Sequence, residues 1–272
     1  MTEPIPSRTS WPAELVLVRH GESEGNLADA RARAARAEVL DLTARDADVL
    51  LSPLGRRQAG AVGRWFSAGG QAPGVPQVVL CSPYARALST ARELVAAARA
   101  EGLDLPDPRT DERLRERDLG WWDGLTGAGV RARFPEEAAK RERLGKFYYR
   151  PPGGESWCDV ALRVRSFLRD VRADHAGTRV LVVSHQAVIM NFRLVVEDLD
   201  EEAILHLDAT APLANCSVTS YRGDGDGLDV VLAGDTTATA DVRVTDDPVD
   251  DEPDDRAPTG AAAHAEPVEA TS

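Results

Sequence analysis

Three short apolar runs in this chain each end at or next to candidate catalytic or ligand-binding residues. Stretches with helical periodicity separate the runs. The runs cover residues 15–19, 77–81 and 179–184. Apolar strands that alternate with helices are typical of a parallel sheet covered by helices on both faces. We therefore predict an α/β fold, a three-layer α/β/α sandwich with a mostly parallel central sheet. In such folds, ligand-binding and catalytic groups gather at the carboxyl ends of the strands.

Capping residues mark the expected starts of the helices. Ser52 and Ser82 are each followed by proline, which predicts an N-cap and a first helical position at both places. The first of these helices should end at the glycine pair that begins with Gly69. Ser156 and Asp159 resemble a capping box at the start of another helix, which continues as an apolar stripe facing the core.

The net charge is unevenly distributed. The 272 residues carry −13 overall, and the segment from Asp235 onward, with 11 acidic and 2 basic residues, contributes −9 of it. The rest of the chain is close to balanced and offers no electrostatic footprint for nucleic acid. The acidic segment contains almost no large apolar residues, so it cannot bury enough surface to offset its chain entropy.

These features divide the chain into three parts. Residues 1–13 form an N-terminal extension, residues 14–234 a single domain, and residues 235–272 a tail that we predict to be disordered. Within the domain, residues 27–48 are a helical insertion rich in alanine and arginine. This insertion is either a mobile cap over the site or a surface helix, and the sequence does not decide between the two.

Cysteine usage and hydropathy bear on the compartment. Cys81, Cys158 and Cys216 are odd in number and far apart, so neither a disulfide framework nor a zinc site is suggested. No stretch approaches the ~20 apolar residues that a membrane span requires, and residues 1–12 contain no apolar run of signal-peptide length. We expect a cytoplasmic protein with no membrane or nucleic-acid partner. The oligomeric state stays open.

Arg19 is the last residue of the first apolar run, and His20 follows it. The histidine ring offers a nitrogen nucleophile or base, and the guanidinium group offers a fork of donors shaped for phosphate. His185 closes another apolar run in the same way. Histidines that end parallel strands can converge across neighbouring strands, so His20 and His185 are candidates for one site.

The triplet Arg19-His20-Gly21 resembles the hallmark of the histidine phosphatase superfamily, also called phosphoglycerate-mutase-like. Further motifs of that family occur in family order at residues 81–87, 114–120, 152–156 and 184–188. The resemblance covers about residues 14–222. It implies that His20 is transiently phosphorylated, that Arg19 and Arg86 hold the phosphate, and that His185 is a second catalytic histidine.

The same resemblance suggests further site residues. The family places a general acid two residues after a leucine, which selects Glu116, while Asp118 and Glu112 remain rivals. Asn26 and Ser23 match positions that line the phosphate pocket. Backbone N–H groups around Gln186, at the start of a helix, are available to the same anion.

Two segments bear on the choice of substrate. Residues 147–156 and the Gln186-Ala187 pair look more like the fructose-2,6-bisphosphatase branch than the mutase branch. In the cofactor-dependent mutases the second histidine is usually followed by Gly-Asn, and a tryptophan usually stands where this chain has Gly25. Tyr149 and Arg150, with Lys146, could bind a second anionic group of a sugar phosphate, or belong to a packed loop.

Other functions are compatible with parts of this pattern. Residues 21–25 match the Gly-x-Ser-x-Gly elbow of serine hydrolases, with Ser23 as nucleophile, but that interpretation leaves Arg19 and Arg86 without a role. A non-catalytic phosphate-binding protein is a second alternative. A metal bound by His20 and His185 is disfavoured because nearby arginines would repel a cation.

The sequence therefore predicts a phosphatase that needs no metal or other cofactor. It would hydrolyse a small phosphomonoester, such as a sugar phosphate, through a phosphohistidine intermediate. Phosphoryl transfer of the phosphoglycerate mutase type is the alternative.

Overall fold

The computed structural model describes residues 10–69 and 73–246 of the chain. Its strands are β1 (Glu14–Arg19), β2 (Val78–Cys81), β3 (Arg109–Thr110), β4 (Arg179–Ser184), β5 (Val218–Gly223) and β6 (Leu228–Asp235). Its α-helices are α1 (Glu24–Ala34), α2 (Pro53–Ala68), α3 (Ala85–Ala100), α4 (Gly127–Arg133), α5 (Pro135–Leu144), α6 (Trp157–Asp174), α7 (Gln186–Val196) and α8 (Glu201–Thr210). Short 3-10 helices are η1 (Asp46–Asp48), η2 (Glu112–Leu114), η3 (Gly120–Trp122) and η4 (Thr237–Thr239).

The strands form one sheet in the order β3-β2-β4-β1-β5-β6. β3, β2, β4 and β1 run parallel, whereas β5 and β6 are antiparallel to their neighbours. The predicted α/β class is thus confirmed, and the three predicted strands lie within one residue of their expected bounds. β1 and β4 are adjacent and pair Arg19 with Ser184, so both strands end at the same level.

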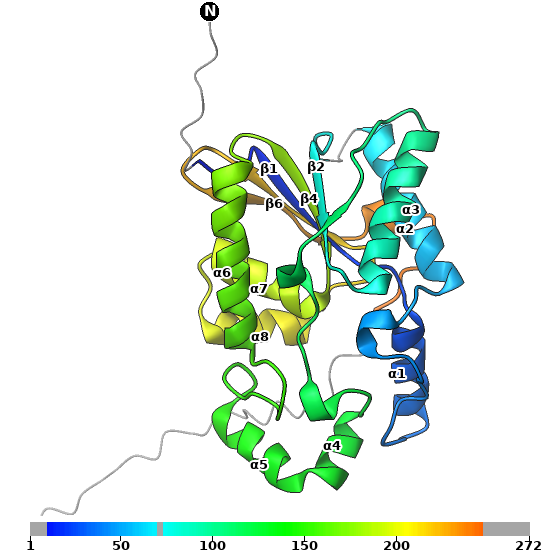
Figure 1. Ribbon diagram of the computed structural model, residues 1–272, viewed down its shortest axis with the longest axis vertical. Helices are drawn as coiled ribbons and strands as arrows, with labels where there is room; N and C mark the ends of the chain where they lie inside the picture. The colour runs from blue at the N-terminus through cyan, green and yellow to red at the C-terminus, as the bar shows by residue number, and fades with distance from the viewer. Residues whose placement is uncertain (1–9, 70–72, 247–272) are drawn as a thin grey trace, which may run out of the picture.

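Alternating side chains of the central strands point into two cores, as a sheet covered on both faces requires. Leu15 and Leu17 pack with α6 and α7, while Val16 and Val18 pack with α2 and α3. Figure 1 shows α6, α7 and α8 on one side of the sheet and α2 and α3 on the other. The predicted three-layer sandwich is confirmed.

Two of the three predicted N-caps are confirmed. Ser52 caps α2, which ends at Gly69, and Ser156 forms a capping box with Asp159 at the start of α6. The prediction for Ser82 is wrong, because α3 begins only at Ala85. The Ser82 hydroxyl group instead accepts a hydrogen bond from the N–H of Tyr84, and its oxygen lies 2.8 Å from Nε2 of His185.

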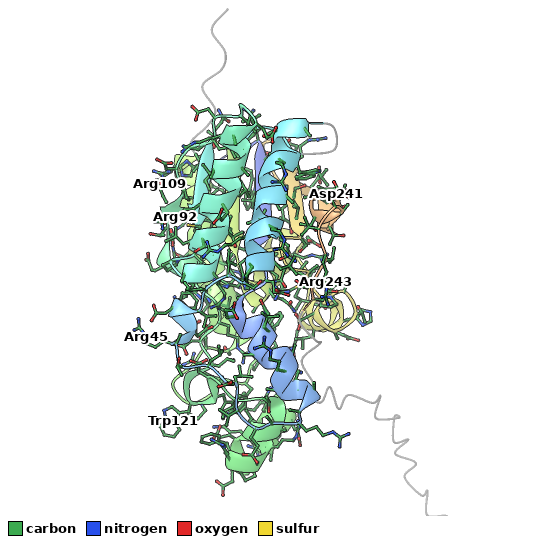
Figure 2. All side chains as sticks on the ribbon, turned by 90° about the vertical axis from the view of Figure 1, so that its right-hand side faces the viewer. Arg45, Arg92, Arg109, Trp121, Asp241 and Arg243 are labelled. Atoms are coloured by element: carbon green, nitrogen blue, oxygen red, sulfur yellow. The ribbon has the colours of Figure 1, made fainter. Side chains whose placement is uncertain are left out.

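The C-terminal segment differs from its prediction. Residues 235–246 are not a disordered tail: Thr239 is fully buried, and Thr245 exchanges hydrogen bonds with Asn215 and receives one from Gln58 of α2. Figure 2, in which Asp241 and Arg243 are labelled, shows this segment beside α2. Small side chains and hydrogen bonds hold it in place, which an argument from large apolar residues misses. Residues 247–272, the rest of the predicted tail, and residues 1–9 lie outside the described part of the chain.

The predicted insertion at residues 27–48 is only partly helical: α1 ends at Ala34, and the 3-10 helix η1 covers Asp46–Asp48. Its second part contacts the segment before α4: Leu40 donates to the carbonyl oxygen of Gly124, and Thr126 donates to that of Glu38. These segments and α4 and α5 lie beyond the carboxyl ends of the parallel strands (Figure 1). We name residues 35–51 together with residues 120–145 the cap region. Within the described residues, no helix is long and apolar enough to span a membrane.

Candidate active site

The site is centred on the two histidines that follow β1 and β4. The backbone N–H of His20 donates to the carbonyl oxygen of Ser184 at 2.9 Å, which extends the pairing of the two strands by one step. As a result the rings of His20 and His185 meet edge to face with 5.1 Å between their centroids. Both side chains are buried. The structure thus brings together the two histidines that the sequence placed at separate strand ends.

The tautomer of His20 is fixed by the backbone of the next residue. Nδ1 lies 2.8 Å from the carbonyl oxygen of Gly21, and a carbonyl oxygen can only accept, so Nδ1 carries the proton. Nε2 is left with its lone pair. Burial lowers the pKa of His20 well below its usual value, and the charges of Arg86 and Arg19 lower it further. His20 is therefore a neutral imidazole with Nε2 available as a nucleophile at neutral pH.

A close backbone approach explains the glycine after His20. A Cβ atom on Gly21 would lie 2.5 Å from the carbonyl oxygen of Gly55, near the start of α2. The N–H of Gly21 donates to the hydroxyl oxygen of Thr90 in α3. Only glycine fits where the loop after β1 crosses α2, so this residue fixes the direction in which His20 leaves the strand.

Arg19 and Arg86 are the two buried cations of the site. The Arg19 guanidinium group donates to the carbonyl oxygen of Leu213. Arg86, from the first turn of α3, donates to the carbonyl oxygen of Asp46 at 2.6 Å and lies 2.9 Å from its carboxylate. Asp46 belongs to η1 of the cap region, so a carboxylate of the cap contacts the arginine that we expect to bind phosphate.

Glu116 stands out among the three acids that the sequence left as rivals. Its Oε2 atom lies 3.9 Å from Nδ1 of His185. Burial raises its pKa from 4.5 to about 7, although the N–H of Arg117 and the charge of Arg86 act against this rise. Glu112 and Asp118 are exposed, and Asp118 turns back to accept from the N–H of Gly120. A carboxyl group with a pKa near 7 can both give and take a proton at neutral pH.

His185 and its neighbours line the other side of the site. Nε2 of His185 lies 2.8 Å from the Ser82 hydroxyl oxygen, and no hydrogen-bond partner of Nδ1 is found in the described part of the structure. Burial, followed by the charge of Arg86, lowers its pKa well below the usual value. The Tyr84 ring packs edge to face on His185, and burial with nearby carboxylates raises the pKa of Tyr84 to about 12.

Ser23 and Asn26 form the capping box of α1. The Asn26 side-chain oxygen accepts from the N–H and the hydroxyl group of Ser23, and the Ser23 oxygen accepts from the N–H of Asn26. Ser23 is 2% exposed. Its hydroxyl group is committed to the start of α1, which argues against the serine hydrolase alternative. Asn215 connects this capping box to the site by donating to the carbonyl oxygen of His20.

The side chains of the remaining candidates have partners other than the two histidines. Gln186 begins α7 as expected, and its amide donates to Asp208, which also binds Lys146. Tyr149 is fully buried, stacks on Trp122 and donates to Glu137. Arg150 is paired with Asp159. Tyr149 thus has a packing role, and Arg150 serves the capping box of α6. Among residues 10–69 and 73–246, neither forms a hydrogen bond or ring contact with the two histidines.

Several site residues were missed by the sequence reasoning. Ser82 was interpreted as a helix cap, although it stands in the same motif as Arg86. Asp46 lies in the insertion, and nothing in its sequence context indicates a contact with Arg86. Asn215 follows no recognisable motif, because it acts through the backbone of His20 from 195 residues away.

Comparisons with known proteins agree with this geometry. Residues 15–236 match the histidine phosphatase superfamily (branch 1). The bifunctional protein Rv2228c of Mycobacterium tuberculosis is 36% identical over 216 residues, which cover 79% of this chain and 52% of that protein. This chain thus spans about half the length of the first curated relatives it matches. The 2,3-bisphosphoglycerate-dependent phosphoglycerate mutase 2 of Gloeobacter violaceus is 30% identical, with 79% of this chain and 88% of the mutase covered.

A solved structure shows the same architecture. Mycobacterial glucosyl-3-phosphoglycerate phosphatase Rv2419c, in complex with VO3, is similar with a TM-score of 0.63 and 27% identity over 82% of this chain and 98% of that one. The paired histidines, the arginines beside them and the match over most of the chain lead to one conclusion. The chain belongs to the histidine phosphatase superfamily.

Proposed function

We propose that this protein is a phosphatase, which transfers the phosphoryl group of a small phosphomonoester to Nε2 of His20 and then to water. One observation carries the proposal: a neutral His20, whose Nδ1–H donates to the carbonyl oxygen of Gly21, lies beside His185 and two buried arginines. The guanidinium groups supply donors and positive charge for the phosphoryl oxygens, so no metal is required for that purpose.

In the first step, the Nε2 lone pair forms the bond to phosphorus while the bond to the leaving oxygen breaks. The leaving oxygen takes the proton of the Glu116 carboxyl group, which is about half protonated at pH 7 because its pKa is about 7. Arg19 and Arg86 would hold the equatorial oxygens, on which charge spreads in the transition state. Arg86 must then exchange its contact with Asp46 for the phosphoryl group.

We assign the proton of His185 to Nδ1. The Ser82 oxygen already accepts from the N–H of Tyr84, so its own proton can be donated to Nε2 of His185. Nδ1 then faces Glu116 as a donor for a phosphoryl oxygen. Removing Ser82 should therefore weaken phosphoryl transfer without removing a group that touches the substrate.

In the second step, water attacks the phosphorus of phosphorylated His20, and the bond between nitrogen and phosphorus breaks. The Glu116 carboxylate formed in the first step takes the proton of the attacking water. Inorganic phosphate leaves, and Nε2 of His20 regains its lone pair. One carboxyl group thus serves both half-reactions, for which a pKa near 7 is suited.

Phosphoglycerate mutase chemistry is the second candidate, because a mutase is among the relatives with extensive coverage. Phosphatase activity is favoured by Gln186-Ala187 after the second histidine, where those mutases usually have Gly-Asn. The similarity to a solved glucosyl-3-phosphoglycerate phosphatase also supports it. We propose a sugar phosphate or a similar metabolite as the substrate class.

The test is phosphate release from a panel of sugar, glycerate and nucleotide phosphates. Wild type should release inorganic phosphate from at least one of them, and His20→Ala, folded to the same extent, should release none. A phosphoester that isomerises without phosphate release would show a mutase instead. Equal release by wild type and His20→Ala would contradict the assignment of His20.

A further inference from the structure

The motif at residues 152–156 has no part in the chemistry described above, although it lies beside the loop that carries Glu116. Two backbone hydrogen bonds join the two segments: Glu155 donates to the carbonyl oxygen of Asp118 at 2.8 Å, and Trp121 donates to that of Pro152 at 3.0 Å. The exposed Trp121 marks this loop in Figure 2.

Two glycines allow this close approach. Gly120 has φ +56°, and a Cβ atom on it would lie 2.2 Å from the carbonyl oxygen of Pro152. A Cβ atom on Gly154 would lie 2.5 Å from the carbonyl oxygen of Asp118. Gly120 ends the 114–120 motif, and Gly154 is the second glycine of the 152–156 motif. Both lack the Cβ atom that would prevent the two segments from approaching each other.

The side chain of Glu155 binds the acid-bearing loop on both sides of Glu116. One carboxylate oxygen accepts from Arg115 at 2.6 Å, and the other accepts from the N–H of Asp118 at 3.1 Å. The carbonyl oxygen of Glu155 accepts from the side chain of Arg117. Residues before and after the acid are thus tied to one glutamate, whose side chain is only 14% exposed.

Arg163 of α6 completes the arrangement. It is paired with Glu155 at 3.0 Å, and its guanidinium group also donates to the carbonyl oxygen of Glu116. The Arg163 charge by itself lowers the pKa of Glu116. The Glu155 carboxylate balances that charge, and it also balances the charge of Arg115.

We propose that Glu155 is a positioning residue, which holds the Glu116 carboxyl group against His185 by clamping both flanks of the acid-bearing loop. This inference rests on the proposed role of Glu116 as general acid. Glu155 itself does not contact Glu116's carboxyl group in any hydrogen bond or ion pair found among the described residues. Its effect on catalysis should therefore follow the demand of the leaving group for a proton.

The experiment compares two substrates in three proteins. Alkyl phosphates need the leaving oxygen protonated, whereas 4-nitrophenyl phosphate does not. Glu116→Gln removes the proposed general acid and gives the reference value for the difference between the two substrates. Glu155→Gln keeps the size of the side chain and removes its charge. Glu197→Gln is the matched control, because Glu197 is 14% exposed, is paired with Arg193 and lies in another part of the fold.

Glu155→Gln should lower kcat for the alkyl phosphate about tenfold more than kcat for the nitrophenyl ester, part of the 10²–10⁴-fold that a general acid contributes. KM should change little, since Arg19 and Arg86 are not touched. Glu197→Gln should leave the ratio of the two substrates at the wild-type value. Equal loss on both substrates would overturn the positioning role.

A pH profile gives a second readout that a purely structural role would not move. The groups that face the Glu116 carboxyl group are the N–H of Arg117, the guanidinium groups of Arg86 and Arg163, the Asp46 carboxylate and the His185 ring. With Glu155 neutral, the charge of Arg163 is no longer balanced and the pKa of Glu116 falls. The loss of kcat/KM at alkaline pH should therefore begin at a lower pH than in wild type, and an unchanged profile would contradict the proposal.

The experiment distinguishes failure of the proposed role of Glu116 from failure of the proposed role of Glu155. If Glu116→Gln itself affects both substrates equally, then Glu116 is not the acid and the proposed function fails. If only Glu155→Gln does so, the clamp alone is refuted. Should Glu155→Gln not fold, Arg115→Ala removes one partner of the clamp from a more exposed position and must show the same preference for loss on the alkyl phosphate.

Discussion

The raised pKa of Glu116 predicts that Glu116→Gln loses activity and gains stability, in a way that depends on pH. The folded protein holds the Glu116 proton with a pKa of about 7, against 4.5 for the ordinary carboxyl group. At about 1.36 kcal/mol for each pKa unit, this difference corresponds to about 3 kcal/mol of unfolding free energy.

The sign follows from proton binding. The folded carboxyl group binds a proton more tightly than the unfolded one, so wild-type stability falls as pH rises from 4.5 to about 7. Below that window both states are protonated and the glutamate costs nothing. Above it the full penalty for burying a carboxylate applies. Glutamine has the shape of the protonated acid and carries no such penalty.

Urea unfolding of wild type and Glu116→Gln at about pH 8 and about pH 4.5 measures the effect. The variant should be more stable by about 3 kcal/mol at the higher pH and nearly equal at the lower one. Glu112→Gln, an exposed position in the same loop, should show no such pH dependence. A stability difference that is the same at both pH values would refute the assignment of a largely buried acid with a raised pKa.

Four other predictions follow from the site. For an alkyl phosphate, kcat/KM should decrease above about pH 7 as Glu116 ionises, and this decrease should be absent in Glu116→Gln. His20→Ala should still bind inorganic phosphate in calorimetry, because Arg19 and Arg86 remain; lost binding with an intact fold would contradict this. Asp46→Asn should bind phosphate more tightly than wild type, since Arg86 loses a competing carboxylate, and an unchanged or weaker Kd would contradict the competition. A fluorophosphonate should not label Ser23, whose hydroxyl group caps α1, and labelling there would revive the serine hydrolase alternative.

The sequence predicted three strands of the sheet and the histidine pair because those depend on local patterns. Apolar runs define β1 and β4, and parallel strands deliver the residues that follow them to one edge. The N-caps predicted at Ser52 and Ser156 are confirmed for the same reason, because capping depends on residues close in sequence. At Ser82 an identical signal failed, because the hydroxyl group contacts His185, which is 103 residues away. A local motif does not reveal such a competing partner.

Other parts of the site depend on contacts that no local pattern encodes. Asp46 reaches Arg86 only because residues 35–51 fold back over the strand ends. The sequence leaves Tyr149 as either a polar contact for substrate or part of a packed loop, and the structure shows it buried, with its hydroxyl group donating to Glu137. Residues 235–246 looked disordered by composition, yet Thr245 is held by Gln58 and Asn215. In each case the contact is polar and the partner lies 12 or more residues away in the sequence.

The most direct test of the account is to trap the phosphorylated enzyme. Wild type is mixed with a turned-over phosphomonoester, quenched under alkaline conditions that preserve phosphohistidine, digested and analysed by mass spectrometry. The account predicts one added phosphoryl group on the peptide that contains His20, which acid removes and which His20→Ala lacks. Turnover that leaves His20 unmodified, or a phosphoryl group trapped on another residue, would contradict the central claim.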